Sequence, residues 1–380
     1  LCWPWLIWRA RARSGPPRKI LLIQTAKIGD MLCATPVIAA LRAAYPHAEL
    51  TVLHDPITSR IIAHQPGLRR LAQPARAFRG LAGRRALLRL LRDGQYDTVL
   101  TLSPNLSFWL APFWAGAARR WSIVPTWPGR TLAAARACLS DGEAHQPGEL
   151  VLDTLARLLA RHGVTLGRDK QIHLADSAAA ALAALHLPAG RAIGLGVSAA
   201  NKLKELGVPK LVEVCQRLLA ASDAHLVLIG SGGDSPLAQA IASQVNSPRL
   251  IDATGRFQLD ELPALLQRLD AYVGVDSGIT YLADTVHTPI VTVVGPTDPR
   301  EQRALDDRLE AMRTFTDRWE ELHHRQANAA QMASPSYKLA ALDQDWLLSD
   351  INRGVRFMLE YAKVEEALDR WGVRSTIVVF

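Results

Sequence analysis

Short apolar runs alternate with amphipathic stretches through most of this chain of 380 residues. The alternation is clearest after residue 190. Strands are expected there at 192–197, 225–229, 271–275 and 290–294, and helices at 210–220, 236–244, 259–269 and 279–286. Strands that alternate with helices of this length form parallel sheets with helices on both faces. The sequence therefore predicts an α/β fold.

The first half of the chain shows the same alternation over fewer elements. Strands are expected at residues 19–24, 49–53 and 98–102, and helices at 29–41 and 150–162, with a further helix whose end lies at 87–91. Residues 104–147 are rich in aromatic residues and proline, and this composition predicts irregular structure.

A break containing Pro and Gly at residues 187–190 separates the two halves. Two α/β units in series predict two Rossmann-like domains that face a central cleft, with ligands bound beyond the carboxyl ends of the strands. The predicted divisions are a disordered N-terminal extension (1–17), a first domain (18–187), a second domain (188–345) and a C-terminal helix and tail (346–380).

Composition excludes several classes of protein. The chain is 49% hydrophobic and 21% charged, so it has enough apolar surface to bury a core. No apolar run approaches the roughly 20 residues of a membrane-spanning helix. The four cysteines lie far apart, which argues against a disulfide scaffold and favours a reducing compartment. The histidines have no partner at metal-ligand spacing, so no metal site is expected.

Residues 1–8 are apolar, contain three tryptophans and precede three arginines. A secretory signal has the opposite order, with its basic residues first. We expect a disordered extension here. The alternative is a weak interfacial anchor, with the tryptophans at the level of lipid headgroups.

The positive charge of the chain is concentrated in its first part. Residues 1–150 carry 20 Lys and Arg against 8 Asp and Glu, a net charge of +12, whereas the whole chain carries +8. This asymmetry predicts an anionic partner for the first domain. Nucleic acid is disfavoured because the arginines are not interleaved with aromatic residues. A membrane surface or an acidic, lipid-linked substrate fits the same charge, and solvated arginines account for part of the excess.

Asp30 follows the first predicted strand and opens the first predicted helix. A carboxylate at this edge of a parallel sheet is placed to act on a ligand in the cleft. A helix-capping role, in which the side chain accepts hydrogen bonds from the first turn, explains the same position equally well.

Asp276, Ser277 and Gly278 hold the equivalent position after a later strand. The amides at the helix start form an anion site suited to a pyrophosphate. Asp276 either binds a sugar hydroxyl or caps the helix. The turn at 295–299 follows the next strand and is expected to line the same pocket.

Two further loops contain small or polar residues. Residues 198–204 combine small residues, which allow close approach of the backbone, with two lysines that could neutralise phosphate. Residues 230–234 are rich in glycine, but the third glycine of a dinucleotide fingerprint is replaced by Ser235. We therefore expect the second loop to lie near a nucleotide base or ribose and not to bind NAD.

Together, in this order, these motifs resemble those of glycosyltransferase family 9, the heptosyltransferase-like enzymes. The resemblance is carried by residues 27–30, Thr35 and Pro36, the loop ending at Lys204, residues 253–256, residues 276–278 and residues 295–299. It implies a GT-B fold and transfer of a sugar from a nucleotide-sugar donor, with inversion and without a metal or cofactor. It also implies lipopolysaccharide core acceptors at the cytoplasmic face of the bacterial inner membrane.

The resemblance assigns roles to individual residues. Asp30 is implied to be the general base that takes the proton of the acceptor hydroxyl. Lys204 and the amides of Ser277 and Gly278 would stabilise the leaving nucleoside diphosphate, and Asp276 would contact the donor sugar. Further donor contacts are expected at Ser198, Ala200, Gly230, Thr254 and Tyr281.

Tyr281 departs from the family, which usually has His at this position. A tyrosine can hydrogen-bond but cannot carry positive charge at neutral pH. ADP-heptose remains the expected donor. The alternative is a catalytically inactive or regulatory protein that keeps the fold and binds a nucleotide or glycan.

The resemblance also gives the basic first domain an expected partner, an anionic, lipid-linked glycan acceptor at the inner-membrane surface. This would make the protein cytoplasmic and peripheral to the membrane, with no nucleic-acid partner. Candidate acceptor contacts are Arg60, Arg119, Arg120 and Arg130.

Overall fold

The computed structural model describes residues 15–126, 129–146 and 148–293. Most of the predicted extension (1–17) lies outside these ranges. The predicted turn at 295–299 and the predicted C-terminal helix and tail (346–380) lie entirely outside them.

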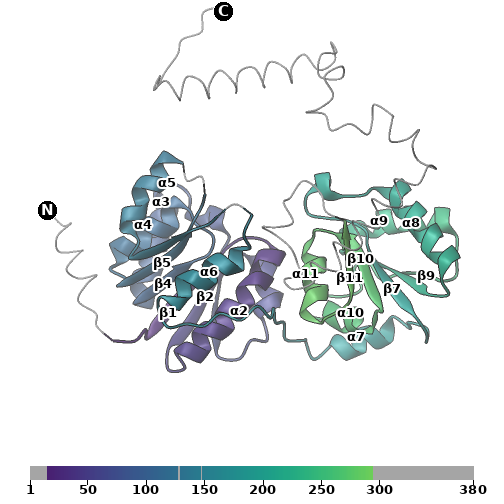
Figure 1. Cartoon of the computed structure of the whole chain (residues 1–380), viewed down its shortest axis with the longest axis horizontal. Helices are drawn as coiled ribbons and strands as arrows, with labels where there is room; N and C mark the ends of the chain where they lie inside the picture. Colours follow the sequence, from purple (N-terminus) through teal and green to yellow (C-terminus); the bar gives the residue numbers. More distant parts are fainter. Residues whose placement is uncertain (1–14, 127–128, 147, 294–380) are drawn as a thin grey trace, which may run out of the picture. The chain divides into compact units, whose positions relative to one another are not determined.

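The first sheet has six parallel strands in the order β3-β2-β1-β4-β5-β6 (Figure 1). The strands are β1 (Lys19–Gln24), β2 (Glu49–His54), β3 (Leu68–Ala72), β4 (Thr98–Thr101), β5 (Arg119–Val124) and β6 (Asp141–Ala144). The chain runs outward from β1 to β3 and then crosses back to β4. The topological switch point of this sheet therefore lies between β1 and β4.

Side chains of β1 alternate between two helical layers, because successive residues of a strand point to opposite faces. Ile20 and Leu22 pack in the cluster that contains α2 (Ile28–Ala44) and α6 (Val151–Ala160). Leu21 and Ile23 pack in the cluster that contains α3 (Gly80–Gly94) and α4 (Leu106–Ala115). Shorter helical segments complete this part of the fold: η1 (Pro56–Ile62), η2 (Ala75–Phe78), α5 (Arg130–Ala135) and η3 (Arg136–Cys138).

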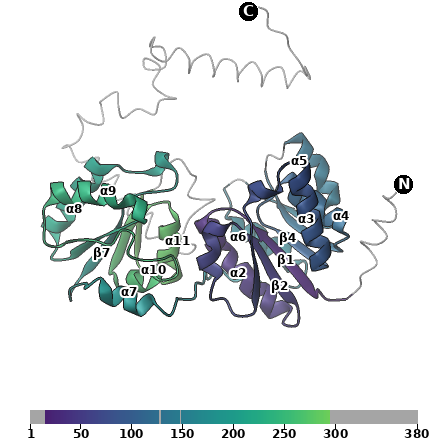
Figure 2. The same cartoon turned by 180° about the vertical axis from the view of Figure 1, so that it is seen from behind.

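The second sheet has five parallel strands in the order β11-β10-β7-β8-β9. They are β7 (Ala192–Gly196), β8 (His225–Ile229), β9 (Leu250–Asp252), β10 (Ala271–Val275) and β11 (Ile290–Val293). Helices α8 (Val208–Ala221) and α9 (Ser235–Val245) cover one face. Helices α7 (Ala178–Ala184), α10 (Leu262–Arg268) and α11 (Gly278–Thr285) cover the other (Figure 2). Two short turns, η4 (Lys202–Lys204) and η5 (Gly232–Asp234), follow β7 and β8.

The predicted α/β class is confirmed, but residues 104–147 were wrongly expected to be irregular. They contain α4, β5, α5 and β6. Helix α4 is apolar around most of its surface and contains Pro112, so it lacks the usual periodicity. Strand β6 has the sequence DGEA, which is short and polar because it lies at the edge of the sheet. The unpredicted strands β3 and β9 are also edge strands.

The Thr35-Pro36 motif lies inside α2 and has a clear local role. Pro36 has no N–H to donate to the carbonyl of Leu32, four residues earlier. The hydroxyl of Thr35 donates to that carbonyl instead, at 2.7 Å. The same hydroxyl accepts the backbone N–H of Gln171 at 2.9 Å, which ties the segment between the two sheets to α2.

Ion pairs link the elements of the two sheets. Lys170, whose side chain is only 2% exposed, contacts the Asp284 carboxylate of α11 at 3.0 Å. Arg60 and His64 both contact the buried Asp260 at 3.1 Å. Helix α7 packs on α10, a helix of the second sheet, although α7 precedes the predicted domain boundary at residue 187. The predicted domain limits stay a prediction.

Replacing Lys170 tests the buried ion pair. Lys170→Met removes this buried ammonium from beside the Asp284 carboxylate, so we expect the free energy of unfolding in urea to fall by about 3 kcal/mol. Arg191 is a matched control, because its pair with Asp223 is 3.9 Å long and both side chains are more than 60% exposed. Arg191→Met should change the value by less than about 0.5 kcal/mol. Equal effects of the two substitutions would contradict the assignment.

Candidate active site

Loops at the switch points of both sheets line one cavity of about 690 Å³. The first sheet contributes residues 25–27 after β1 and residues 102–105 after β4. The second contributes Ala200 and Asn201 after β7, and Asp276 and Ser277 after β10. Switch points are where open parallel sheets bind ligands, so this cavity is the candidate active site.

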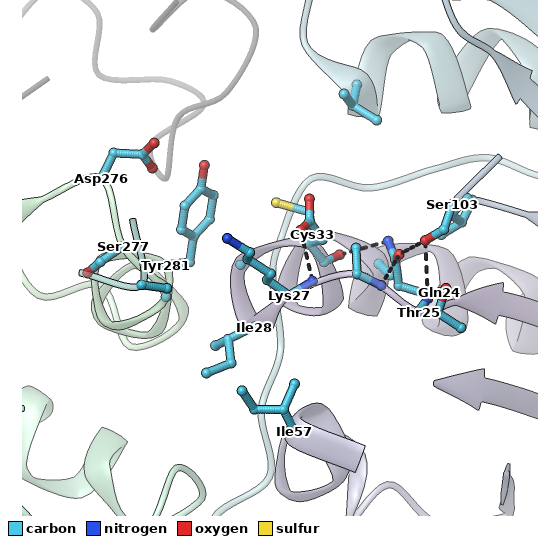
Figure 3. Close-up of a pocket in the computed structure, with 18 of the residues that line it drawn as sticks. Gln24, Thr25, Lys27, Ile28, Cys33, Ile57, Ser103, Asp276, Ser277 and Tyr281 are labelled. Atoms are coloured by element: carbon cyan, nitrogen blue, oxygen red, sulfur yellow. Dashed lines mark hydrogen bonds between the residues drawn. The ribbon is translucent and has the colours of Figure 1, made fainter. Parts of the chain in front are cut away.

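Hydrogen bonds hold the turn between β1 and α2 in one conformation (Figure 3). The side-chain amide of Gln24 donates to the backbone carbonyl of Asp30 at 3.2 Å, and its oxygen accepts the hydroxyl of Ser103. Ser103 in turn accepts the backbone N–H of Thr25 at 3.1 Å. The loops after β1 and β4 therefore position the start of α2 together.

Asp30 is the third residue of α2, where its side chain bonds back to the residue before the helix, and it also lines the cavity. Its action on a ligand stays a prediction. Its carboxylate accepts the backbone N–H of Lys27 at 3.1 Å. The protein around the cavity desolvates this carboxylate and raises its pKa above the usual 3.8. The negative charge of Asp276 acts in the same direction, while the hydrogen bond and the charge of Lys27 oppose the increase in pKa.

The second sheet brings positive charge and polar groups to the same cavity. The ammonium of Lys204 donates to the carboxylate of Asp276, and both side chains are less than 20% exposed. Ser277 and Gly278 begin α11, whose first amides have no partner within the helix. Burial raises the pKa of Tyr281, which remains a neutral phenol beside Asp276.

Helices α2 and α11 approach each other closely at two glycines. A Cβ atom on Gly278 would lie 2.7 Å from Cγ2 of Ile28, and one on Gly29 would lie 3.0 Å from Cδ2 of Tyr281. Figure 3 shows Tyr281 projecting from α11 and Lys27 projecting from the start of α2. Both helix starts thus face the cavity, because neither glycine carries a side chain to separate them.

Seven of the ten predicted site residues line the cavity: Asp30, Ala200, Lys204, Asp276, Ser277, Gly278 and Tyr281. The other three predicted residues do not line it. Ser198 lies beside Asp234, Gly230 follows β8, and Thr254 follows β9 and donates to Asp252 at 2.7 Å. Strands β8 and β9 lie away from the switch point, which explains the position of their loops. A donor-binding role for these three residues stays a prediction.

Sequence analysis missed several residues that line the cavity. Gln24 is the last residue of β1, Ser103 and Asn105 lie in the loop after β4, and Leu152 and Leu155 belong to α6. Ser103 could have been found, because it directly follows a predicted central strand. The residues of α6 gave no signal in the sequence, because an apolar wall of a cavity has the same pattern as a buried core.

The predicted acceptor contacts of two arginines need correction. Arg119 and Arg120 are the first residues of β5, so they lie at the amino edge of the sheet, away from the cavity. The guanidinium of Arg120 is buried and donates to the carbonyls of Cys138 and Ala118. Arg60 is paired with Asp260, but its side chain is half exposed, so its acceptor contact stays a prediction. Arg130 is exposed at the start of α5, and its role stays a prediction.

Two parallel α/β sheets with one cavity at both switch points form the GT-B architecture, and solved structures confirm this fold. A family 9 glycosyltransferase from Veillonella parvula is 20% identical with a TM-score of 0.63, and the match covers 79% of this chain and 91% of that one. The Escherichia coli heptosyltransferase WaaC with ADP-2-deoxy-2-fluoro heptose is 18% identical with a TM-score of 0.57, and the match covers 79% and 99%.

Sequence comparison identifies the family. The family model for glycosyltransferase family 9 (heptosyltransferase) matches residues 84–332. Lipopolysaccharide heptosyltransferase 3 of Escherichia coli is 25% identical over 281 residues, which is 71% of this chain and 81% of the relative. The chain therefore belongs to glycosyltransferase family 9, and it is a glycosyltransferase.

Two features are absent from the described ranges. Within them, no three His, Cys, Asp or Glu side chains are grouped as metal ligands would be. None of their helices is long and apolar enough to cross a membrane.

A double-mutant cycle tests the contact between α2 and α11. Gly278→Ala should lower the free energy of unfolding by about 1–3 kcal/mol, because the added methyl group overlaps Ile28. In an Ile28→Ala background the same substitution should cost at least 1 kcal/mol less. Gly167 has open space around it and is the control, so Gly167→Ala should be close to neutral. An equal cost of Gly278→Ala in both backgrounds would contradict the contact.

Proposed function

We propose that this protein transfers a heptose from ADP-heptose to a hydroxyl of a lipopolysaccharide core or related glycan, with inversion and without a metal ion. The observation that carries the proposal is that Asp30 and the Lys204–Asp276 pair line the same cavity. The names of the Escherichia coli relatives, a lipopolysaccharide heptosyltransferase and a heptosyltransferase with an ADP-sugar analogue, support the donor and the acceptor class.

Asp30 is the proposed general base. An inverting transfer is a single displacement, in which the acceptor hydroxyl attacks the anomeric carbon opposite the leaving diphosphate. Asp30 takes the hydroxyl proton as the new glycosidic bond forms. Its raised pKa makes its carboxylate a stronger base than that of an ordinary aspartate.

Lys204 and the start of α11 are proposed to hold the diphosphate. As the bond to the sugar breaks, negative charge develops on the leaving oxygen. A buried ammonium and helix-terminal amides stabilise that charge in the role that a divalent cation fills elsewhere. Asp276 keeps Lys204 in place before the donor binds, and it accepts a hydrogen bond from a donor hydroxyl.

Tyr281 is proposed to contact the donor as a neutral hydrogen-bonding group. Its ring packs over Gly29 and its side chain is 8% exposed, so its position is fixed by both helices. A histidine here could share a positive charge with the diphosphate, whereas tyrosine cannot. In this chain, Lys204 therefore carries the larger part of that electrostatic role.

The acceptor is proposed to be anionic and lipid-linked, so the reaction would take place at the cytoplasmic surface of the inner membrane.

Asp30→Asn tests the base directly. We expect the rate of transfer at saturating donor to fall by 10²–10⁴-fold, while the Kd for ADP-heptose changes less than about threefold. The wild-type rate should fall as the pH drops through the raised pKa of Asp30. The measurements are transfer kinetics and calorimetric binding of the donor.

Thermal stability provides a second readout of the same substitution. The raised pKa means that folded Asp30 binds its proton more tightly than unfolded Asp30, so its ionised form lowers stability at neutral pH. Asp30→Asn should therefore raise Tm at pH 7, and the gain should disappear as the pH falls below the folded-state pKa. Lost donor binding with unchanged turnover at saturation would reject the base role. Donor binding without hydrolysis or transfer by the wild type would favour a regulatory protein.

A further inference from the structure

Helix α3 presents an exposed arginine face that the proposed chemistry does not use. Four arginines occur within its 15 residues, and all four are exposed: Arg84, Arg85, Arg89 and Arg92. Asp93 is the only acidic residue of this helix. Among the described residues, Arg84, Arg85 and Arg89 have no ion pair. The opposite side of α3 is buried on the sheet through Gly83, Leu87 and Leu91.

Apolar side chains accompany these arginines. Leu81 is 73% exposed and lies four residues before Arg85, so the two share one side of the helix. Arg89 and Arg92 continue the same line. Arg92 donates to the backbone carbonyl of Trp114 in α4 at 3.3 Å, and Trp114 is itself 44% exposed. Figures 1 and 2 both show α3 and α4 side by side. We call Leu81, Arg84, Arg85, Arg89, Arg92 and Trp114 the α3 surface.

The α3 surface begins near the candidate active site. Helix α3 connects the parallel strands β3 and β4, so it begins near the carboxyl edge of the sheet and runs back toward the amino edge. The cavity lies at the carboxyl edge. Ala75, in the turn between β3 and α3, lines the cavity. Ile57 lines it as well and is 59% exposed.

We propose that the α3 surface docks this enzyme onto an anionic lipid bilayer, with α3 lying along the membrane and the cavity beside it. The arginines meet lipid phosphates, Leu81 enters the boundary with the acyl chains, and Trp114 lies at headgroup level. Contact with a second copy about a two-fold axis would set arginines against arginines. Nucleic acid offers no apolar medium for Leu81. The inference rests on the proposed function only in that a lipid-linked acceptor gives membrane docking a purpose.

Vesicle sedimentation with the purified full chain tests this docking. The vesicles contain either phosphatidylcholine alone or phosphatidylcholine with about one third phosphatidylglycerol. The wild type should bind the anionic vesicles far more tightly, and binding should weaken with added salt. Each arginine near an anionic surface strengthens binding about fivefold, so Arg84→Gln, Arg85→Gln and Arg89→Gln together should weaken binding roughly 100-fold.

A matched control removes the same three charges from exposed positions in the second half of the chain, through Arg191→Gln, Lys210→Gln and Arg217→Gln. This control should bind within about threefold of the wild type. Leu81→Ala should weaken vesicle binding several-fold without changing the net charge. Melting curves of all variants check that they fold.

Three outcomes would contradict the proposal that the α3 surface docks onto the bilayer. They are equal binding of the wild type to neutral and anionic vesicles, equal losses in the α3 and control variants, or an α3 variant that loses binding to a 20-base-pair DNA but not to vesicles. The vesicle assay contains neither donor nor acceptor, so its failure would leave the role of Asp30 untouched. Loss of transfer by Asp30→Asn would likewise leave vesicle binding unchanged.

Discussion

The close approach of α2 and α11 is the contact on which the site depends. Each helix begins at the switch point of its own sheet, and each has a glycine where it meets the other. A side chain at Gly29 or Gly278 would push the two helix starts apart. Because these positions are open, the carboxylate of Asp30 and the ammonium of Lys204 line one space. The GT-B fold supplies the two edges, and the glycines bring them together.

The enclosure that forms the cavity also sets its electrostatics. Among the described residues, two carboxylates and two lysines line the cavity, and only the side chains of Lys204 and Asp276 form an ion pair. Asp30 remains without a cationic partner at salt-bridge distance within the described part of the chain. Its basicity is therefore raised by desolvation and by Asp276. The same environment makes its charge unfavourable in the folded protein, as is common where stability and function conflict.

Most internal strands could be predicted from sequence, whereas most edge strands could not. The internal strand β5 was missed, because it lies within residues 104–147. The predicted limits of 19–24 match β1, because a strand covered on both faces is a continuous apolar run. The edge strand β6 has no apolar run, and α4 has no polar face. Asp30 and Asp276 were found because they lie where the chain passes from a strand that borders a switch point into the following helix. Arg120 could not be placed, since only the register of β5 shows that it lies at the far edge and points into the protein.

The most direct test of the central claim is a crystal structure of this protein with an intact, unreactive nucleotide-sugar. We expect the diphosphate to bind against Lys204 and the first amides of α11. The anomeric carbon should face the Asp30 carboxylate, with space for one acceptor hydroxyl between them. A sugar directed away from Asp30, or a diphosphate bound outside this cavity, would contradict it.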